Sequence, residues 1–257
     1  MELELRRKLL KLYYDARCGH IGCSLSCLDL LYSIFKHRDG QERVILSKGH
    51  AAGALYIVLN HFGEISDEEL ATFYIDGTRL SAHPSANSFE NIPFALGSLG
   101  HGLPIACGIA RGHQISKSNE SVYVLMSDGE TNEGTTWEAA HFAVSNQLDN
   151  LIVLIDRNRL QGFGNTIDIL GDTSDPLKWQ AMGFEVHQLD GHDLDEIANT
   201  LAECKKSRNQ KPHVIIAETI KGKGVDFMEN KMEWHYLPLT PALYDQALAS
   251  LESAYYA

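Results

Sequence analysis

Two short apolar runs, separated by one helix-like stretch, constrain the fold of this chain more than any other feature. The first run, residues 122–126, stops at a tight Asp128-Gly129 turn, and the second, residues 151–155, stops shortly before Asn158. A short apolar run that ends in a turn is typical of a buried parallel strand. Residues 135–146 between the runs carry apolar side chains amid polar neighbours, as an amphipathic helix does. The segment therefore predicts one strand–helix–strand unit.

The rest of the chain continues this alternation of helix and strand. Ser66 and Glu69 form a capping box that opens one short helix, and residues 78–94 are expected to form a loop. Alternation of this kind predicts one α/β domain over residues 1–257, doubly wound, with a mostly parallel sheet and helices on both faces. Further helices are expected over residues 3–16, 25–35, 51–62, 99–115, 176–182, 193–207 and 241–253, and further strands over 185–189 and 213–218.

Asp128 and Asn158 should lie close together, because each follows a strand and parallel strands end at the same edge of a sheet. In open α/β sheets that edge is where ligands bind. Mg²⁺ takes about six hard oxygen ligands, usually shared among one or two protein groups, a phosphate and water. Asp128 offers a carboxylate, Asn158 an amide oxygen and Leu160 a backbone carbonyl. Neither a P-loop nor a complete Gly-x-Gly-x-x-Gly after a strand occurs in the sequence, so we expect a metal–diphosphate site of another kind.

Six ordered segments give the chain a resemblance to a known family. The Asp128 to Asn158 arrangement is similar to the thiamine-diphosphate motif, and Glu133-Gly134 in that context looks like transketolase. The resemblance covers nearly the whole chain and implies the fold of a diphosphate-binding domain. The other matching segments are residues 18–24, 46–52, 82–84, 96–102, and 221–224 with His235 downstream.

The resemblance also implies a role for each matching residue. The cofactors would be thiamine diphosphate and Mg²⁺ or Ca²⁺. Histidines from three of the matching segments would surround the reacting carbon, where they donate hydrogen bonds to sugar hydroxyls and move protons. The implied sets are His20, His83, His235 and Glu133 for catalysis, His50, Gly97, Leu99, Gly129, Glu130, Asn158 and His235 for cofactor binding, and Asp128, Asn158 and the carbonyl of Leu160 for the metal.

Glu133 points to a missing partner. In transketolases the matching carboxylate reaches across a subunit interface toward a cofactor-activating glutamate of the pyrimidine-binding domain. That domain follows the present one in a full-length transketolase, whereas this chain ends at Ala257. We therefore expect a split enzyme, in which a C-terminal subunit carries the pyrimidine-binding domain. The expected assembly is a heterotetramer with two copies of each chain (α2β2).

The activity that the resemblance implies is transfer of a two-carbon ketol unit from a ketose, such as a sugar phosphate, to an aldehyde. His20, His83 and His235 suit a polyhydroxylated sugar. One alternative uses the same cofactor but transfers an acyl anion from a 2-oxoacid. A second alternative is a non-catalytic, cofactor-binding subunit.

Charge, hydropathy and cysteine content limit the partners and the cellular location expected for this chain. The net charge is 22 minus 34, or -12, without a lysine-rich arm, which argues against a nucleic-acid partner. No apolar run approaches the ~20 residues of a membrane span, and the N-terminus lacks a secretory signal. Five cysteines, an odd count, suit the reducing cytoplasm. Cys18, His20, Cys23 and Cys27 lie near one another in sequence, but their spacing matches no usual zinc pattern, so we expect buried thiols.

Three residues depart from the family pattern, and one of them is Arg159, which replaces a smaller residue common in relatives. Ser127 stands where the family usually has glycine, and His101 stands where it usually has glutamine. Both are expected near the cofactor, and His101 would add a titratable group beside a reactive site. The sequence therefore leaves the identity of the donor and acceptor sugars open.

Overall fold

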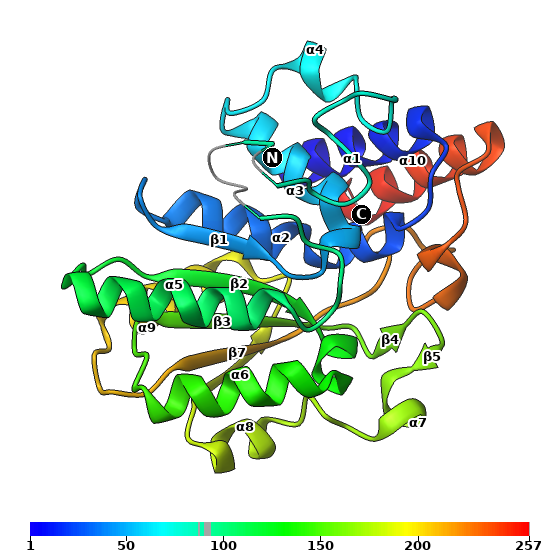
Figure 1. Cartoon of the computed structure of the whole chain (residues 1–257). Helices are drawn as coiled ribbons and strands as arrows, with labels where there is room; N and C mark the ends of the chain where they lie inside the picture. The colour runs from blue at the N-terminus through cyan, green and yellow to red at the C-terminus, as the bar shows by residue number, and fades with distance from the viewer. Residues whose placement is uncertain (87, 90–93, 257) are drawn as a thin grey trace.

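The computed structural model describes residues 1–86, 88–89 and 94–256, and its centre is a five-stranded sheet (Figure 1). All neighbouring strands of this sheet are parallel. The three central strands are almost entirely buried, which is why their sequences read as continuous apolar runs. In spatial order the strands are β1 (Arg43–Leu46), β2 (Val122–Ser127), β3 (Leu151–Arg157), β7 (His213–Glu218) and β6 (Glu185–Asp190).

Helices cover both faces of the sheet (Figure 1). One face packs against α5 (Gly102–Ser116), α6 (Gly134–Ser145) and α8 (Pro176–Met182). The other face packs against α2 (Ile21–His37) and α9 (Leu194–Lys206). The predicted doubly wound α/β fold is therefore confirmed.

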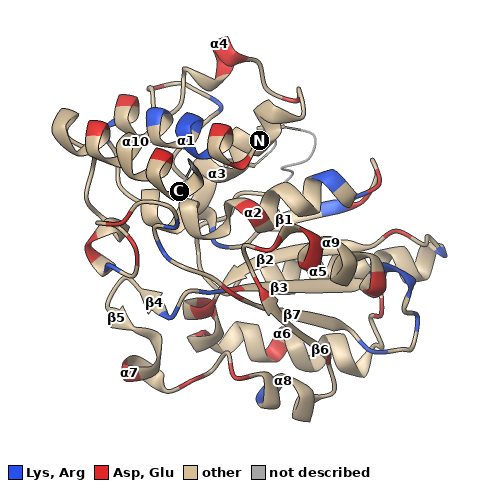
Figure 2. Ribbon diagram, turned by 180° about the vertical axis from the view of Figure 1, so that it is seen from behind, with Lys and Arg blue, Asp and Glu red and all other residues tan. Residues whose placement is uncertain are grey.

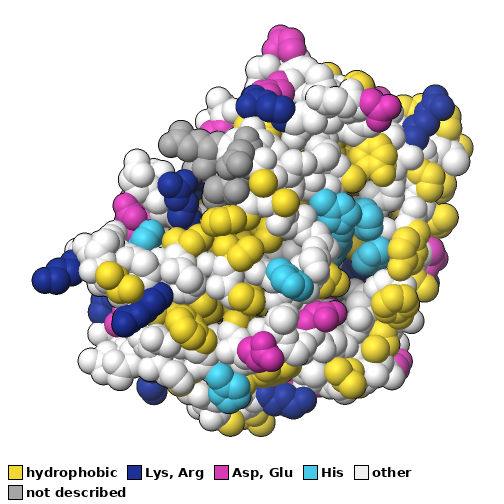
Figure 3. All heavy atoms as spheres, in the orientation of Figure 1, with side chains coloured by type: hydrophobic (Ala, Val, Ile, Leu, Met, Phe, Trp, Pro, Cys, Tyr) yellow, Lys and Arg dark blue, Asp and Glu magenta, His cyan; other side chains and the backbone are white. Residues whose placement is uncertain are grey.

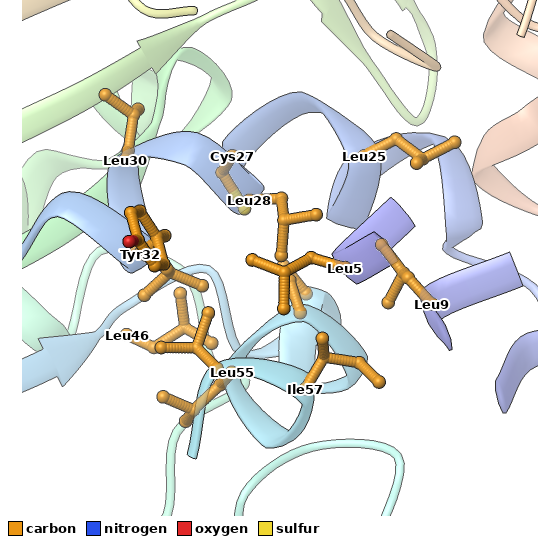
Figure 4. Close-up of a cluster of buried hydrophobic side chains, with 14 of the residues drawn as sticks. Leu5, Leu9, Leu25, Cys27, Leu28, Leu30, Tyr32, Leu46, Leu55 and Ile57 are labelled. Carbon is orange, nitrogen blue, oxygen red and sulfur yellow. The ribbon is translucent and has the colours of Figure 1, made fainter. Parts of the chain in front are cut away.

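A second layer of helices makes α2 a core element. Its residues from Ile21 to Phe35 are all buried, since it lies between the sheet and α1 (Glu2–Ala16), α3 (Ala52–His61) and α10 (Pro241–Tyr256). Figure 4 shows Leu5 and Leu9 of α1 pointing into the same cluster as the leucines of α2. Each fully buried apolar side chain of this kind contributes about 1.5–3 kcal/mol to the free energy of unfolding.

Most predicted elements are present, with shifted ends. The strand–helix–strand unit is β2, α6 and β3, and Ser66 does cap α4 (Asp67–Leu70) by accepting a hydrogen bond from Glu69 N. Helix α5 begins three residues later than predicted. Gly100 adopts φ of 79°, outside the right-handed helical region, so the helix begins only after it; a Cβ atom there would lie 2.6 Å from the Glu133 Cβ atom.

Several short elements were not predicted from the sequence. Strand β1 has only four residues, and the hairpin β4 (Leu160–Gln161) with β5 (Gly164–Asn165) has two in each strand. Segments this short carry too few residues to show a period. The other missed elements are α7 (Thr166–Leu170) and the 3₁₀ turns η1 (Gly49–Ala51), η2 (Asp128–Asn132) and η3 (Met232–His235).

The surface carries mixed charge. Figure 2 shows Lys and Arg scattered among the more numerous Asp and Glu, as the net charge of -12 requires. In the described part of the chain, no helix combines the length and the apolar character needed to cross a membrane.

A buried ion pair links the segment after β1 to β3 at the carboxyl edge of the sheet. Lys48, which follows β1, pairs with Asp156 of β3, and their side chains are 1% and 0% exposed. Ser26 Oγ of α2 donates to Asp156 Oδ1 at 2.6 Å, and Thr219 Oγ1 also donates to this oxygen. Burial opposes both charges, but their mutual attraction outweighs it, so the pKa of Asp156 lies below its usual value and the pKa of Lys48 above.

We expect Lys48→Met to lower the free energy of unfolding by about 3–5 kcal/mol, because it leaves the Asp156 carboxylate buried and unpaired. Urea denaturation measures this loss. The double variant Lys48→Met/Asp156→Asn should recover part of it. Lys11→Met, which removes an exposed pair with Asp15, is the control and should change stability by less than about 1 kcal/mol. A loss in Lys48→Met as small as in this control would contradict the assignment.

Candidate functional site

A cleft of about 250 Å³ opens where β1, β2, β3 and β7 end. Figure 3 shows histidine side chains gathered on this face of the molecule. The cleft brings together ten of the residues predicted from sequence, from seven separate segments of the chain. These residues are His20, His50, His83, Gly97, Leu99, Asp128, Gly129, Asn158, Leu160 and His235.

Asp128 forms the floor of the cleft and is only 1% exposed. Its Oδ1 accepts from Gly129 N at 2.8 Å, and its Oδ2 accepts from Arg159 N at 2.7 Å and from Thr166 Oγ1 at 3.1 Å. Among the described residues no cationic side chain forms an ion pair with it. Burial, together with the nearby charge of Asp156, raises the pKa of Asp128 to about 6. A buried carboxylate in this state favours a cation beside it.

The turn after β3 supplies the other oxygens predicted to bind a metal. Arg159 adopts φ of 64°, which turns the chain so that Asn158 Oδ1 accepts from Leu160 N at 3.1 Å. The Leu160 carbonyl accepts from Lys221 Nζ at 3.3 Å, so this oxygen already faces a positive charge. A carboxylate, an amide and a carbonyl thus meet at one edge of the cleft, and these hard oxygens are the ligands that Mg²⁺ or Ca²⁺ prefers.

Two glycines shape the cleft wall. A Cβ atom at Gly97 would lie 3.0 Å from His83 Cδ2, and one at Gly129 would lie 3.2 Å from Gln161 Cβ. Side chains at either position would push neighbouring groups of the cleft wall. Both positions therefore favour glycine, which keeps the cleft wall in place.

Four histidines line the rest of the cleft. The His20 ring centroid lies 5.6 Å from that of His50, 5.8 Å from His83 and 5.1 Å from His235. His20 has φ of 75° just before α2, His50 lies in η1 and His235 ends η3, so the rings reach one another only in the folded chain.

These histidines are neutral at neutral pH. Burial lowers the pKa of His20, His50 and His235 to about 4, and nearby positive charge assists at His20 and His235. Burial also lowers the pKa of His83. Neutral imidazoles both donate and accept hydrogen bonds, so the cleft suits a ligand rich in hydroxyl groups.

The cleft lining also includes residues that were not predicted from the sequence, and three of them carry titratable groups: Cys23, Lys48 and Lys221. Cys23 Sγ lies 3.4 Å from His235 Nδ1, and Lys221 Nζ lies 3.1 Å from the same nitrogen. Burial opposes ionisation of Cys23, but the charge of Lys221 and contact with His50 outweigh it and lower the Cys23 pKa to about 6. All three residues lie within segments that match the family, residues 18–24, 46–52 and 221–224. This position was the signal in the sequence that could have identified them.

The remaining predicted residues lie outside the cleft lining. Glu130 is buried, and it accepts hydrogen bonds from Ser47 Oγ, from Gly100 N at 3.0 Å and from Ser127 N at 2.9 Å, so it fastens the loops beneath the cleft. Glu133 is exposed at the start of α6. Their assignments to cofactor binding and catalysis stay predictions.

The structure corrects the expectation for His101. It is exposed and lines a groove between α5 and α6 with Pro104 and Phe142, outside the cleft. It therefore adds no titratable group to the cleft, whereas Ser127 does line it. All five cysteines are buried free thiols, as expected.

Comparison with known proteins agrees with this geometry. The family described as "Transketolase, thiamine diphosphate binding domain" matches residues 10–251. The chain is 40% identical over 245 residues to a subunit of the apulose-4-phosphate transketolase of Actinobacillus succinogenes, covering 90% of this chain and 87% of that protein. It is 37% identical over 246 residues to a subunit of the 6-deoxy-6-sulfo-D-fructose transketolase of a Clostridium species, covering 91% and 88%.

Longer relatives match over only part of their length. Transketolase of Homo sapiens is 32% identical over 255 residues, which are 93% of this chain but 39% of that protein. The crystal structure of transketolase from Campylobacter jejuni superposes with a TM-score of 0.87 and 28% identity, over 98% of this chain and 42% of that one. The chain therefore belongs to the transketolase family, and residues 10–251 correspond to its thiamine diphosphate binding domain.

Proposed function

We propose that this chain is a subunit of a thiamine-diphosphate-dependent transketolase, which transfers a two-carbon ketol unit from a ketose to an aldehyde. The observation that carries this proposal is the buried Asp128 carboxylate, without a cationic partner among the described residues, beside four neutral histidines. The family match and the names of the relatives support it.

One end of the cleft holds the cofactor. Asp128, Asn158 and the carbonyl of Leu160 bind Mg²⁺ or Ca²⁺, which neutralises the buried carboxylate. His50 and the Gly129 backbone would contact the diphosphate, and Gly97 and Leu99 would lie against the rings of the cofactor. When bound, thiamine diphosphate supplies the electron sink for carbon–carbon bond cleavage.

The other end of the cleft holds the sugar. His20, His83 and His235 are close enough to contact adjacent hydroxyls of one chain of carbon atoms. As neutral imidazoles they accept a proton from one hydroxyl and return it to another oxygen. Two relatives are named for sugars that carry a phosphate or a sulfo group, which supports an anionic ketose as donor.

A second polypeptide completes the enzyme in this proposal. The chain covers most of two relatives that are named as transketolase subunits, but only 39% of a single-chain transketolase. Residues 1–257 are then one diphosphate-binding domain, and a partner brings the pyrimidine-binding domain in a heterotetramer. The exposed carboxylate of Glu133 is available to such a partner. Five buried free thiols support a cytoplasmic location.

Two other functions receive less support. Transfer from a 2-oxoacid requires no set of hydroxyl-binding groups, whereas four histidines line this cleft. A non-catalytic subunit requires no proton-accepting groups beside the cofactor. Both alternatives conflict with the names of the relatives.

Asp128→Ala should abolish Mg²⁺-dependent binding of thiamine diphosphate, because it removes the only charged ligand proposed for the metal. Titration calorimetry of the chain with its partner measures this binding. Asp168→Ala removes an exposed carboxylate of α7 and is the matched control. Unchanged affinity in Asp128→Ala would refute the metal assignment.

His83→Ala should lower kcat/KM for ketose donors by about 10²–10⁴-fold, because a proton-transferring group next to the sugar is lost. Cofactor affinity should change little. Steady-state kinetics with a panel of ketose phosphates, at saturating cofactor, separates the two effects. His141→Ala, on the outside of α6, serves as the control. Turnover of every ketose donor at the wild-type rate would count against the proposal.

The chain alone, with cofactor and Mg²⁺, should show no ketol transfer, and addition of a polypeptide with the pyrimidine-binding domain should restore it. Glu133→Gln should then lower kcat without lowering the melting temperature of the isolated chain, because Glu133 is exposed there. Glu138→Gln, on the same helix, is the control. Ketol transfer by the purified chain alone would overturn the split-enzyme proposal.

A further inference from the structure

A second cluster of potential metal ligands lies at the amino end of the sheet, away from the cleft. His213 is the first residue of β7, and His187 is the third residue of the neighbouring strand β6. The parallel register pairs Glu185 with His213, so the two histidines and Glu185 share one face. Helix α9 covers that face and contributes Cys204.

The geometry of the cluster suits a tetrahedral metal ion. His187 Nε2 lies 3.5 Å from His213 Nδ1. With Zn–N bonds of about 2.0–2.1 Å, tetrahedral Zn²⁺ separates two nitrogen ligands by about 3.3 Å. One ligand atom from each of His187, Cys204 and His213 lies within 4.8 Å of the other two, so a small rotation of side chains brings all three to one ion.

Of the two ring nitrogens of His213, Nδ1 is the one that faces His187 and Glu185. His213 is fully buried, and within the described residues its Nε2 makes no hydrogen bond. Two imidazoles and a thiol placed together under a helix have no evident packing advantage over apolar side chains.

The charges around the cluster and its exposure to solvent are also compatible with binding of a divalent ion. Metal binding would release the proton of the Cys204 thiol to solvent as the sulfur–metal bond forms. Glu185 Oε2 lies 3.8 Å from His213 Nδ1, and its carboxylate with the Cys204 thiolate balances two positive charges. The Glu185 side chain is 31% exposed and His187 is half-buried, which leaves the ion a route from solvent.

We propose that His187, Cys204 and His213 bind one Zn²⁺ ion, with Glu185 beside it, and that this ion fastens α9 to β7 and to the edge strand β6. Strand β6 has a neighbour on one side only. Because the three ligands come from three separate elements, the ion would restrain their relative movement. The site is independent of the thiamine cleft, which lies at the other end of the strands.

Co²⁺ is the probe, since a tetrahedral Co²⁺–thiolate site absorbs in the near ultraviolet and visible. The full chain, saturated with Mg²⁺ and thiamine diphosphate, should bind one equivalent of Co²⁺ with a thiolate charge-transfer band, and one equivalent of Zn²⁺ should remove the band. Cys204→Ser should abolish the band, and His187→Gln should weaken Co²⁺ binding by at least about tenfold.

Two cysteine variants serve as controls. Cys107→Ser replaces a buried thiol under the opposite face of the sheet, and Cys23→Ser replaces the thiol of the thiamine cleft. Both should keep the band. Circular dichroism reports folding, and half-buried His187→Gln remains a usable variant if Cys204→Ser does not fold. A wild-type chain without the band, or a band that survives Cys204→Ser or disappears with Cys23→Ser, would overturn the proposal.

Discussion

The buried pair of Lys48 and Asp156 is the interaction on which the functional end of this molecule depends. It joins the loop after β1 to the end of β3, and Ser26 and Thr219 extend it to α2 and the end of β7. All four surrounding segments carry cleft residues nearby in sequence. Burying both charges costs desolvation free energy, and their attraction offsets this cost only with good geometry and added hydrogen bonds. The four segments must therefore keep their relative positions.

The electrostatics of the cleft depend mainly on burial, and this pair decides which carboxylate is neutralised. Asp156 is neutralised by Lys48, whereas Asp128, which forms no ion pair within the described chain, carries a raised pKa. Burial also keeps the cleft histidines neutral. The folded chain thus holds one site that favours a metal ion and, next to it, a set of uncharged proton acceptors. Unpaired buried charge lowers stability, and such sites are typical of catalytic and binding clefts.

Functional residues gather at both ends of the sheet for the same structural reason. Parallel strands bring residues that are far apart in sequence to a common edge, as with Asp128 and Asn158 at the carboxyl end. At the amino end they bring His187 and His213 together under α9. Only the first pair carried a signal in the sequence, because glycine-rich turns flank it. His187 and His213 lie inside ordinary strands, where a histidine looks like any other residue.

The sequence by itself determined the strand–helix–strand unit and the doubly wound fold, because apolar periods and turns are local properties of a chain. Its resemblance to the transketolase family indicated most of the ten predicted residues of the cleft. Tertiary structure decided the rest. Packing between distant segments decides whether Glu130 faces a ligand or the loops beneath it. It also decides whether His101 enters the cleft and which thiol lies near a lysine. Side-chain environment, and with it each shifted pKa, exists only once those segments meet and exclude water.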